Sequence, residues 1–427
     1  MRLRLRLEQG QFARVYGPAK ARVTEGQVMV LGAIYGDGSE FTVPRYRSYA
    51  LKGLVESAVE MELGVGGTVE NPTPGEEPLD KWVAEIDRAL RRGCRGFMVL
   101  GPVDAGKSSI AALIANRALL YGHRPGVVDA DVGQADIGPP ACISAARVRK
   151  PILWLRSLRA ERMRFVGYIT PQKAERRITA GIVDLAHWLR SSGSDVIVVD
   201  TDGWVQGIQS LMYKLEAAHL AGLDTLVVVG DEKLSRMAVS AWGRRGCGVI
   251  ALASPAKKRT RDRGDRRSLR SEAYRRYLSP LVPREIDLSK IMVLGSCFYS
   301  GEKLPPETAS AYSAMLRVHV EAASETYDTV YVATYGQPDP SSIAKLSDAL
   351  GKQVYILDKN NMRGTLVALV APSGVEEAIG LLEEIDFARD KAVIRTPYSG
   401  DVVGIIVGGT RLSENLEDTG RQLRCVI

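Results

Sequence analysis

The segment from Gly101 to Ser108 contains residue types whose spacing suits the binding of a phosphate. Its sequence, Gly-Pro-Val-Asp-Ala-Gly-Lys-Ser, matches the pattern G-x-x-x-x-G-K-[ST] without a mismatch. In loops of this pattern, backbone N–H groups curl around phosphate oxygens, the lysine reaches the β- and γ-phosphates, and the hydroxyl binds Mg²⁺. Lys107 and Ser108 hold those two positions. A chance match or a glycine-rich turn is the ordinary alternative, so the flanking residues decide between the two readings.

The residues on both sides of this segment supply the elements that a phosphate loop requires. Phe97–Leu100 is a short apolar run that predicts a buried parallel strand, and 109–121 carries apolar residues at helical spacing. A helix that begins at the loop points backbone donors and its dipole toward an anion. We therefore predict a nucleoside triphosphate site. Its predicted contact residues are Gly101, Pro102, Val103, Asp104, Ala105, Gly106, Lys107, Ser108 and Ser109.

Acidic residues follow two further apolar runs. Gly126–Asp129 predicts a second strand, and Asp131 and Gln134 come directly after it. A third run, 195–200, ends in an acid, and Asp202 follows it closely. Ligands of open α/β sheets collect at the carboxyl ends of the strands, so Asp129, Asp131 and Gln134 are expected near the phosphates. For Asp200 and Asp202 two roles remain open, which are holding the metal through water and pairing with arginines. Turn and capping chemistry is the alternative. With the phosphate loop present, we predict Asp129 and Ser108 as ligands of a divalent cation such as Mg²⁺.

The alternation of strands and helices predicts an α/β fold. Its core is a P-loop NTPase domain with a mostly parallel sheet, flanked by N-terminal and C-terminal β-rich domains. The 427 residues are too many for one ordinary core. We predict an N-terminal domain over 1–75, a P-loop kinase domain over 76–288 and a C-terminal domain over 289–427. One helical pattern, near 375–385, is predicted to interrupt the C-terminal strands.

Composition predicts a cytoplasmic protein without a membrane segment. The apolar fraction of 45% and the charged fraction of 25% are typical of globular proteins, and no apolar run reaches membrane-spanning length. Five cysteines show no paired spacing, so we expect them to be reduced. They are Cys94, Cys142, Cys247, Cys297 and Cys425.

The segment 257–277 is strongly basic. Such a run is usually solvated or disordered, but Leu269, Ala273 and Tyr277 recur at helical intervals. This spacing predicts a basic helix, which we call the lid, that closes over the site and offers guanidinium groups to phosphates. The net charge of +7 is modest, so this local excess says more about an anionic partner than the total does.

A series of motifs in the order of the chain gives a specific resemblance. After the phosphate loop come a D-x-G-Q element at 131–134, Thr170-Pro171, a T-x-G-W element at 201–204 and an R-R-x-x-R-x-E pattern at 266–272. With these motifs the segment 79–288 resembles the polyribonucleotide 5′-hydroxyl kinases, an archaeal and eukaryotic family that phosphorylates RNA 5′ ends. The flanking regions resemble that family only in architecture.

The resemblance implies roles for matching residues. Asp131 would orient or deprotonate the incoming 5′-hydroxyl, and the indole of Trp204 would stack on the RNA end, although a core aromatic is the ordinary reading of a tryptophan. The implied RNA contacts are Gln134, Thr170, Thr201, Gly203 and Trp204. The implied catalytic residues are Lys107, Asp131, Arg266, Arg267 and Arg270. The implied partners are RNA 5′ ends, with DNA as an alternative acceptor, and RNA-processing proteins.

We therefore expect an ATP-dependent kinase that moves the γ-phosphate to the 5′-hydroxyl of RNA. Two rival classes remain. A P-loop GTPase or ATPase would use the D-x-x-G pattern at 200–203, but the N-K-x-D motif for guanine is absent from the sequence. A catalytically silent nucleotide-bound scaffold would be favoured if Lys107 or Asp131 were replaced, and both are present.

Overall fold

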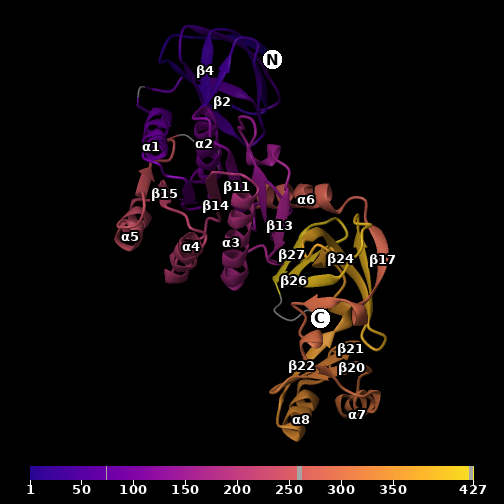
Figure 1. The fold of residues 1–427 in the computed structure, drawn as a ribbon. Helices are drawn as coiled ribbons and strands as arrows, with labels where there is room; N and C mark the ends of the chain where they lie inside the picture. Colours follow the sequence, from indigo (N-terminus) through magenta and orange to yellow (C-terminus); the bar gives the residue numbers. More distant parts are fainter. Residues whose placement is uncertain (74, 257–261, 423–426) are drawn as a thin grey trace. The chain divides into compact units, whose positions relative to one another are not determined.

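The N-terminal residues alternate between polar and apolar, and they form two antiparallel sheets in the computed structural model of the chain (Figure 1). The strand order is β1-β8-β3-β6 in one sheet and β5-β4-β7-β2-β9 in the other. In the first strand, Arg2–Leu7, the leucines turn toward the core while the arginines stay exposed, as a period of two requires. The strands are β1 (Arg2–Leu7), β2 (Phe12–Tyr16), β3 (Ala19–Glu25), β4 (Gln27–Val30), β5 (Ala33–Gly36), β6 (Glu40–Val43), β7 (Ser48–Gly53), β8 (Ser57–Leu63) and β9 (Thr68–Glu70).

The structure describes residues 1–73, 75–256, 262–422 and 427. The chain forms two compact units. Unit 1 comprises 1–138, 143–161 and 171–266, and unit 2 comprises 139–142, 162–170 and 267–427. The division into three domains stays a prediction.

The central sheet of unit 1 is the predicted parallel α/β core. Its strands run in the order β12-β11-β14-β10-β15-β16, and they are parallel except for β12, which is antiparallel to β11. The connection after β10 leads toward β11, whereas the connection after β14 leads toward β15. A ligand crevice is therefore expected at the carboxyl ends of the neighbouring strands β10 and β14. The strands are β10 (Gly96–Leu100), β11 (Pro125–Ala130), β12 (Cys142–Arg147), β14 (Val196–Thr201), β15 (Thr225–Val229) and β16 (Gly248–Leu252).

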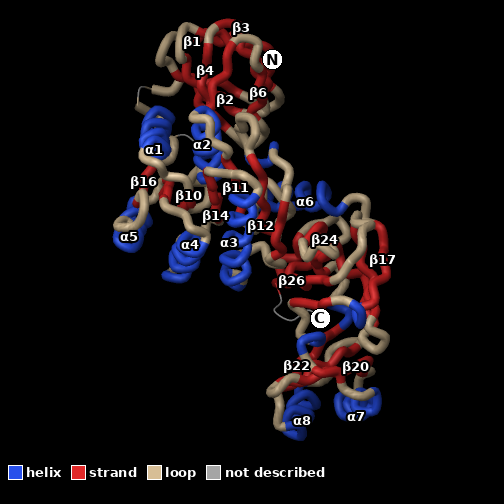
Figure 2. Tube along the Cα trace, in the orientation of Figure 1, coloured by secondary structure: helices blue, strands red, loops and turns tan. Residues whose placement is uncertain are grey.

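Helices surround this sheet, as Figure 2 shows in blue. They are α1 (Leu79–Arg91), α2 (Lys107–Leu120), α3 (Glu175–Ser191), α4 (Ile208–Leu220) and α5 (Glu232–Trp242). The helix α2 is buried along most of its length, which explains why apolar residues surround it rather than forming one stripe. No helix among the described residues is long and apolar enough to cross a membrane.

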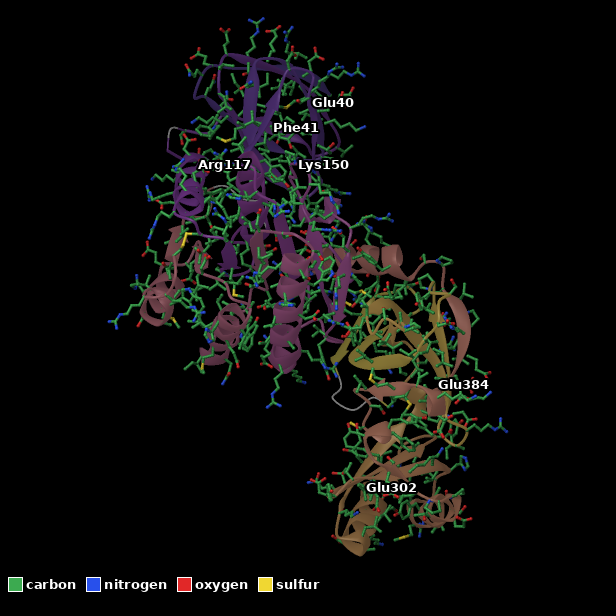
Figure 3. The ribbon with its side chains drawn as sticks, viewed as in Figure 1. Glu40, Phe41, Arg117, Lys150, Glu302 and Glu384 are labelled. Atoms are coloured by element: carbon green, nitrogen blue, oxygen red, sulfur yellow. A yellow bond between two sulfur atoms is a disulfide. The ribbon has the colours of Figure 1, made fainter. Side chains whose placement is uncertain are left out.

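The N-terminal sheets and the parallel core share one hydrophobic cluster. Buried polar contacts reinforce this junction. Arg117 of α2, labelled in Figure 3, pairs with Asp87 of α1 through two nitrogens at 2.7 Å and donates to the carbonyl of Gly32 at 3.2 Å. Arg14 and Glu77 form a second buried ion pair. The N-terminal region is therefore packed as a continuation of the kinase-like core.

Unit 2 is β-rich, as predicted. One sheet runs β17-β25-β24-β23-β26-β18 with β27 paired to β26, and a second runs β19-β20-β21-β22. Its strands are β13 (Arg162–Phe165), β17 (Val282–Asp287), β18 (Met292–Leu294), β19 (Glu302–Lys303), β20 (Val320–Glu325), β21 (Thr329–Thr334), β22 (Gln353–Asp358), β23 (Thr365–Val370), β24 (Glu376–Asp386), β25 (Lys391–Thr396), β26 (Gly404–Leu412) and β27 (Asp418–Gln422). Its helices are α7 (Pro306–Leu316) and α8 (Pro340–Leu350), and α6 (Arg263–Leu278) begins in unit 1 and ends in unit 2.

The helix predicted near 375–385 is wrong, because this segment is β24. It pairs with β23 on one side and β25 on the other, so ladder hydrogen bonds and burial on both flanks override the helix-forming residues. The prediction also missed α7 and α8. Both begin with proline at the first helical position, and Asp339 caps α8, which are signals that the sequence contains.

The expectation of reduced cysteines is confirmed for Cys142 and wrong for Cys94, Cys247 and Cys297, whereas Cys425 lies outside the described residues. Cys94 and Cys247 form a disulfide although 153 residues separate them, and Cys297 is also disulfide-bonded. Cys142 is free and buried. Cys94 and Cys247 precede β10 and β16, the two neighbours of β15, so the parallel sheet brings them together. Asp224 lies beside them, but the joined sulfurs are no longer thiolates that could bind a metal.

This disulfide is expected to stabilise the core of unit 1. Closing so long a loop restricts the unfolded chain, and a stabilisation of about 2–4 kcal/mol is typical of such bridges. We expect the double variant Cys94→Ser/Cys247→Ser to lose that much in urea unfolding under oxidising conditions. Under strong reductant, wild type and the variant should unfold at closely similar urea concentrations. A variant as stable as the oxidised wild type would contradict the assignment of this bridge as stabilising.

Candidate active site

The phosphate loop lies between β10 and α2, and its glycines are required by its shape. Gly106 has φ of 101°, and no atom lies within 4 Å of the position that a Cβ would take. Gly101 has φ of 155°, and a Cβ there would lie 2.6 Å from the carbonyl oxygen of Val229. Gly101 therefore permits close packing on β15, and Gly106 permits a left-handed turn with open space beside it.

Lys107 is buried at the start of α2. Its Nζ donates to the carbonyl oxygen of Pro102 at 2.9 Å, and Ser254 Oγ donates to the carbonyl of Ala105 at 2.9 Å. A lysine with only 7% of its surface exposed has lost most of its hydration. An anion at the loop would restore charge compensation, because a phosphate oxygen is a stronger partner for the ammonium than a neutral carbonyl.

Asp200 is the carboxylate on which the Ser108 side chain acts. It is the next-to-last residue of β14 and pairs in register with Val99 of β10. Burial raises the pKa of Asp200 to about 7, while Lys107 and Ser108 act in the opposite direction. Within the described part of the chain, Asp200 Oδ1 has no hydrogen-bond partner although it is fully buried. A buried oxygen without a donor is the position at which a cation would bind.

Among the described residues, both carboxylate oxygens of Asp129 already accept hydrogen bonds, in contrast to Oδ1 of Asp200. Asp129 Oδ2 accepts the N–H groups of Asp136 at 2.6 Å and Ile137 at 2.8 Å, and its Oδ1 accepts the N–H of Asp131 at 3.3 Å. Burial raises the pKa of Asp129 well above its usual range, and the Asp200 and Asp136 charges add to this. These contacts fix the loop that follows β11. The geometry therefore favours Asp200 over the predicted Asp129 as the carboxylate that faces a metal.

Asp131 and Gln134 lie in that loop. Asp131 Oδ1 accepts the backbone N–H groups of Gly133 at 3.1 Å and Gln134 at 2.9 Å, which orients the carboxylate. Burial raises the pKa of Asp131, and the Lys107 ammonium opposes this. Gln134 Nε2 donates to the carbonyl of Gly133 at 2.8 Å. A fixed carboxylate of raised basicity beside a buried lysine suits the acceptance of a proton.

The residues 201–204, which we call the clasp, press against the phosphate loop. A Cβ on Gly203 would lie 2.5 Å from Val103 Cγ2, so only glycine fits. Thr201 is buried, and its hydroxyl donates to the carbonyl of Val99 at 2.8 Å, which argues against the predicted direct contact with RNA. Trp204 is half-buried and stacks on Tyr213 with ring centroids 5.9 Å apart, so it is not a core aromatic.

The lid forms the predicted helix in its described part, α6, whereas 257–261, including Lys257 and Lys258, lie outside the described residues. In unit 1, Arg266 Nη2 pairs with Asp104 Oδ2 of the phosphate loop at 2.6 Å.

Three predicted site residues belong to unit 2. Arg267 pairs with Glu417 at 3.0 Å, and Arg270 holds Asp418 through two nitrogens at 2.9 and 3.1 Å. Thr170 is exposed. The structure therefore gathers Lys107, Ser108, Asp131, Gln134, Trp204 and Arg266 in unit 1, and the roles of Thr170, Arg267 and Arg270 stay predictions.

A phosphate loop at the switch point of a parallel sheet, with a buried lysine and carboxylates at the strand tips, defines a P-loop NTPase domain. Residues 101–280 match the family model described as mRNA cleavage and polyadenylation factor CLP1 P-loop.

Several curated relatives are described as polyribonucleotide 5′-hydroxyl-kinases, which confirms the predicted resemblance to that family. A polyribonucleotide 5′-hydroxyl-kinase of Pyrococcus abyssi is 27% identical over 351 residues, which cover 80% of this chain and 95% of the relative. The polyribonucleotide 5′-hydroxyl-kinase Clp1 of Gallus gallus is 32% identical over 167 residues, which cover 36% of this chain and 38% of the relative. A chain in the solved structure of a wild-type Clp1p–Pcf11p complex shares the fold with a TM-score of 0.59 and 14% identity, covering 96% of this chain and 98% of that one.

The raised pKa of Asp200 should make the stability of the ligand-free protein depend on pH. Between the ordinary value of 3.8 and about 7, the folded protein keeps a proton on Asp200 that the unfolded chain has lost. The contribution of Asp200 to stability therefore falls as the pH rises through this window. Asp200→Asn is neutral at every pH, so its free energy of unfolding relative to wild type should increase from pH 5 to pH 7. Urea titrations at several pH values measure this, and a difference independent of pH would contradict the buried, protonated state.

Arg266 is the lid arginine that we expect to act on the phosphoryl group, because it already lies at the phosphate loop. We expect Arg266→Ala to lower kcat more than tenfold, about 1.4 kcal/mol of barrier, with a smaller effect on the KM for RNA. The matched control is Arg236→Ala on α5, where the side chain is 73% exposed. If both variants gave the same small, salt-dependent loss, Arg266 would contribute only bulk charge.

Proposed function

We propose that this protein is an ATP-dependent polynucleotide 5′-hydroxyl kinase that transfers the γ-phosphate of ATP to the 5′-hydroxyl of RNA, with DNA as an alternative acceptor. The observation that carries this proposal is Asp131, a fixed carboxylate of raised pKa on which the Lys107 ammonium acts. A nucleoside triphosphatase that activates only water does not need an aromatic clasp beside this carboxylate. The names of the relatives support the same reaction.

On the donor side, the chain contributes positive charge and backbone donors. The N–H groups of the phosphate loop and the Lys107 ammonium would bind the β- and γ-phosphates. Ser108 and Asp200 would hold a divalent cation, and they fit one because a buried carboxylate oxygen beside the hydroxyl lacks a donor. When bound, that cation would neutralise charge on the phosphate oxygens.

On the acceptor side, Asp131 would receive the proton of the 5′-hydroxyl. The 5′ oxygen then forms a bond to the γ-phosphorus, the bond between this phosphorus and the β–γ bridging oxygen breaks, and ADP leaves. The half-buried indole of Trp204 supports the terminal nucleoside by stacking, which tolerates every base. Arg266 exchanges its Asp104 partner for the transferring phosphoryl group, where its charge stabilises the transition state. Arg267 and Arg270 are proposed for the same purpose.

The function places the protein in RNA processing, where protein partners are expected, and the cytoplasmic location stays a prediction. One solved structural neighbour is a Clp1p chain in a complex with Pcf11p. A partner of this kind is therefore part of the proposal.

A transfer assay tests the function. Purified protein, labelled ATP and Mg²⁺ are incubated with a 5′-hydroxyl RNA and, as the matched negative substrate, the same RNA carrying a 5′-phosphate. We expect label on the first RNA only, and none with Lys107→Ala. ATP hydrolysis at the same rate with and without RNA, and no labelled RNA, would overturn the proposal in favour of an NTPase.

The role of Asp131 is tested separately. We expect Asp131→Asn to lower RNA phosphorylation by about 10²–10⁴-fold, the range typical of a lost general base, while the affinity for ATP changes little. Equilibrium binding of a fluorescent ATP analogue provides the second measurement. An equal loss of nucleotide binding would assign Asp131 to the donor site instead.

A further inference from the structure

A buried network of hydrogen bonds lies behind the clasp and connects it to α4. Lys214 Nζ donates to the carboxylate Oδ1 of Asp202 at 3.0 Å, to the backbone carbonyl of Asp202 at 3.0 Å and to the carbonyl of Trp204 at 2.8 Å. An ammonium group has three donors, so Lys214 can satisfy all three of these acceptors. The two carbonyls bracket Gly203, and the lysine thereby fixes the backbone on both sides of that residue.

Asp202 completes this arrangement. Its Oδ1 accepts the N–H of Trp204 at 2.8 Å, and its Oδ2 accepts the hydroxyl of Tyr213 in a short hydrogen bond. The ring of Tyr213 stacks on Trp204 with an interplanar angle of 23°. Burial raises the pKa of Tyr213, and the Asp202 charge adds to this effect. Tyr213 therefore holds the clasp twice, through its hydroxyl and through its ring.

Stability alone is a weak explanation for these buried charges. Asp202 and Lys214 are only 4% and 2% exposed, and burial lowers the pKa of Lys214, which Asp202 counteracts. Apolar residues of similar volume often replace a buried ion pair without loss of stability. The network does what apolar residues could not, because it fixes three successive peptide groups and one indole ring in a single geometry.

We propose that Lys214 and Tyr213, acting through Asp202, are positioning residues that hold Trp204 in the orientation that stacks on the 5′-terminal nucleoside. This inference rests on the proposed function and assigns the network to the binding of the acceptor. Tyr213 covers one face of the Trp204 ring, so the nucleoside stacks on the other face. Base stacking is worth about 1–3 kcal/mol in single-strand binders and is tolerant of sequence. The network therefore sets the affinity for a 5′ end of any base.

A double variant tests this without leaving an unpaired buried charge. Lys214→Met combined with Asp202→Asn removes both charges and the two contacts to the clasp carbonyls. We expect the KM for a 5′-hydroxyl RNA to rise at least tenfold, whereas the KM for ATP stays within about threefold of wild type.

A matched control exists in unit 2. Lys359 and Glu321 form another buried lysine–acid pair, with side chains 8% and 9% exposed, and Lys359 Nζ also donates to the hydroxyl of Tyr335. Lys359→Met with Glu321→Gln should leave the KM for RNA unchanged. Thermal unfolding of both double variants is the control measurement, and each should show a cooperative transition.

Two substitutions at Tyr213 keep the proposal testable if the double variant does not fold. Tyr213→Phe retains the stacked ring and should raise the KM for RNA by no more than about threefold. Tyr213→Leu removes the ring and should match Trp204→Leu in its loss of RNA affinity. Full affinity in Tyr213→Leu would overturn the proposal, and so would an equal loss of ATP and RNA binding in any folded variant.

Binding without ATP separates this proposal from the proposed function. Fluorescence anisotropy of a 5′-hydroxyl RNA labelled at its 3′ end should show at least tenfold weaker binding by the double variant than by wild type. The measurement decides the role of the network even if wild type transfers no phosphate. Equal binding by the folded double variant would overturn the network's role.

Discussion

The arrangement of the site depends on the burial of one lysine ammonium group, that of Lys107, among carboxylates at the edge of a parallel sheet. Lys107 is almost inaccessible to water, and its charge acts on Asp131 and Asp200 by lowering their pKa values. Two effects on the pKa of these acids oppose each other. Burial removes water from the carboxylates and raises their pKa, whereas the positive charge of Lys107 lowers it. The outcome is two acids of raised pKa, and the pKa of about 7 leaves Asp200 partly protonated near neutral pH. A triphosphate and a cation bring the charges that this site lacks.

Close packing transmits this constraint to the surrounding loops. Gly203 lets the clasp touch Val103, and Asp104 in the same loop holds Arg266. Each of these contacts involves the phosphate loop itself. A change in the conformation of this loop on binding ATP would therefore displace both the clasp and Arg266 of the lid. The donor and the acceptor sides of the site share one short piece of backbone.

Local motifs could be predicted from the sequence because their structure depends on neighbours along the chain. The phosphate loop, the strand before it and the helix after it follow from patterns within about 25 residues. Two roles stayed open for Asp200, because its position near Ser108 depends on the order of strands, in which β14 neighbours β10. The ion pair of Asp104 with Arg266 was missed because 162 residues separate the partners, and the contacts of Lys214 were missed because they depend on how α4 packs behind the clasp. No residue type near Lys214 signals a contact with a loop that lies earlier in the chain.

The parallel sheet also determines what the disulfide encloses. Cys94 precedes the phosphate loop and Cys247 follows β15, so the bridged segment includes the phosphate loop, Asp131, the clasp and α4. A single proteolytic cut anywhere within 95–246 would thus leave two fragments joined by a covalent bond. Such nicked molecules would migrate as one species on a non-reducing gel and separate only after reduction. Their donor and acceptor residues would stay tethered, so one cut in a surface loop need not separate the two halves of the site.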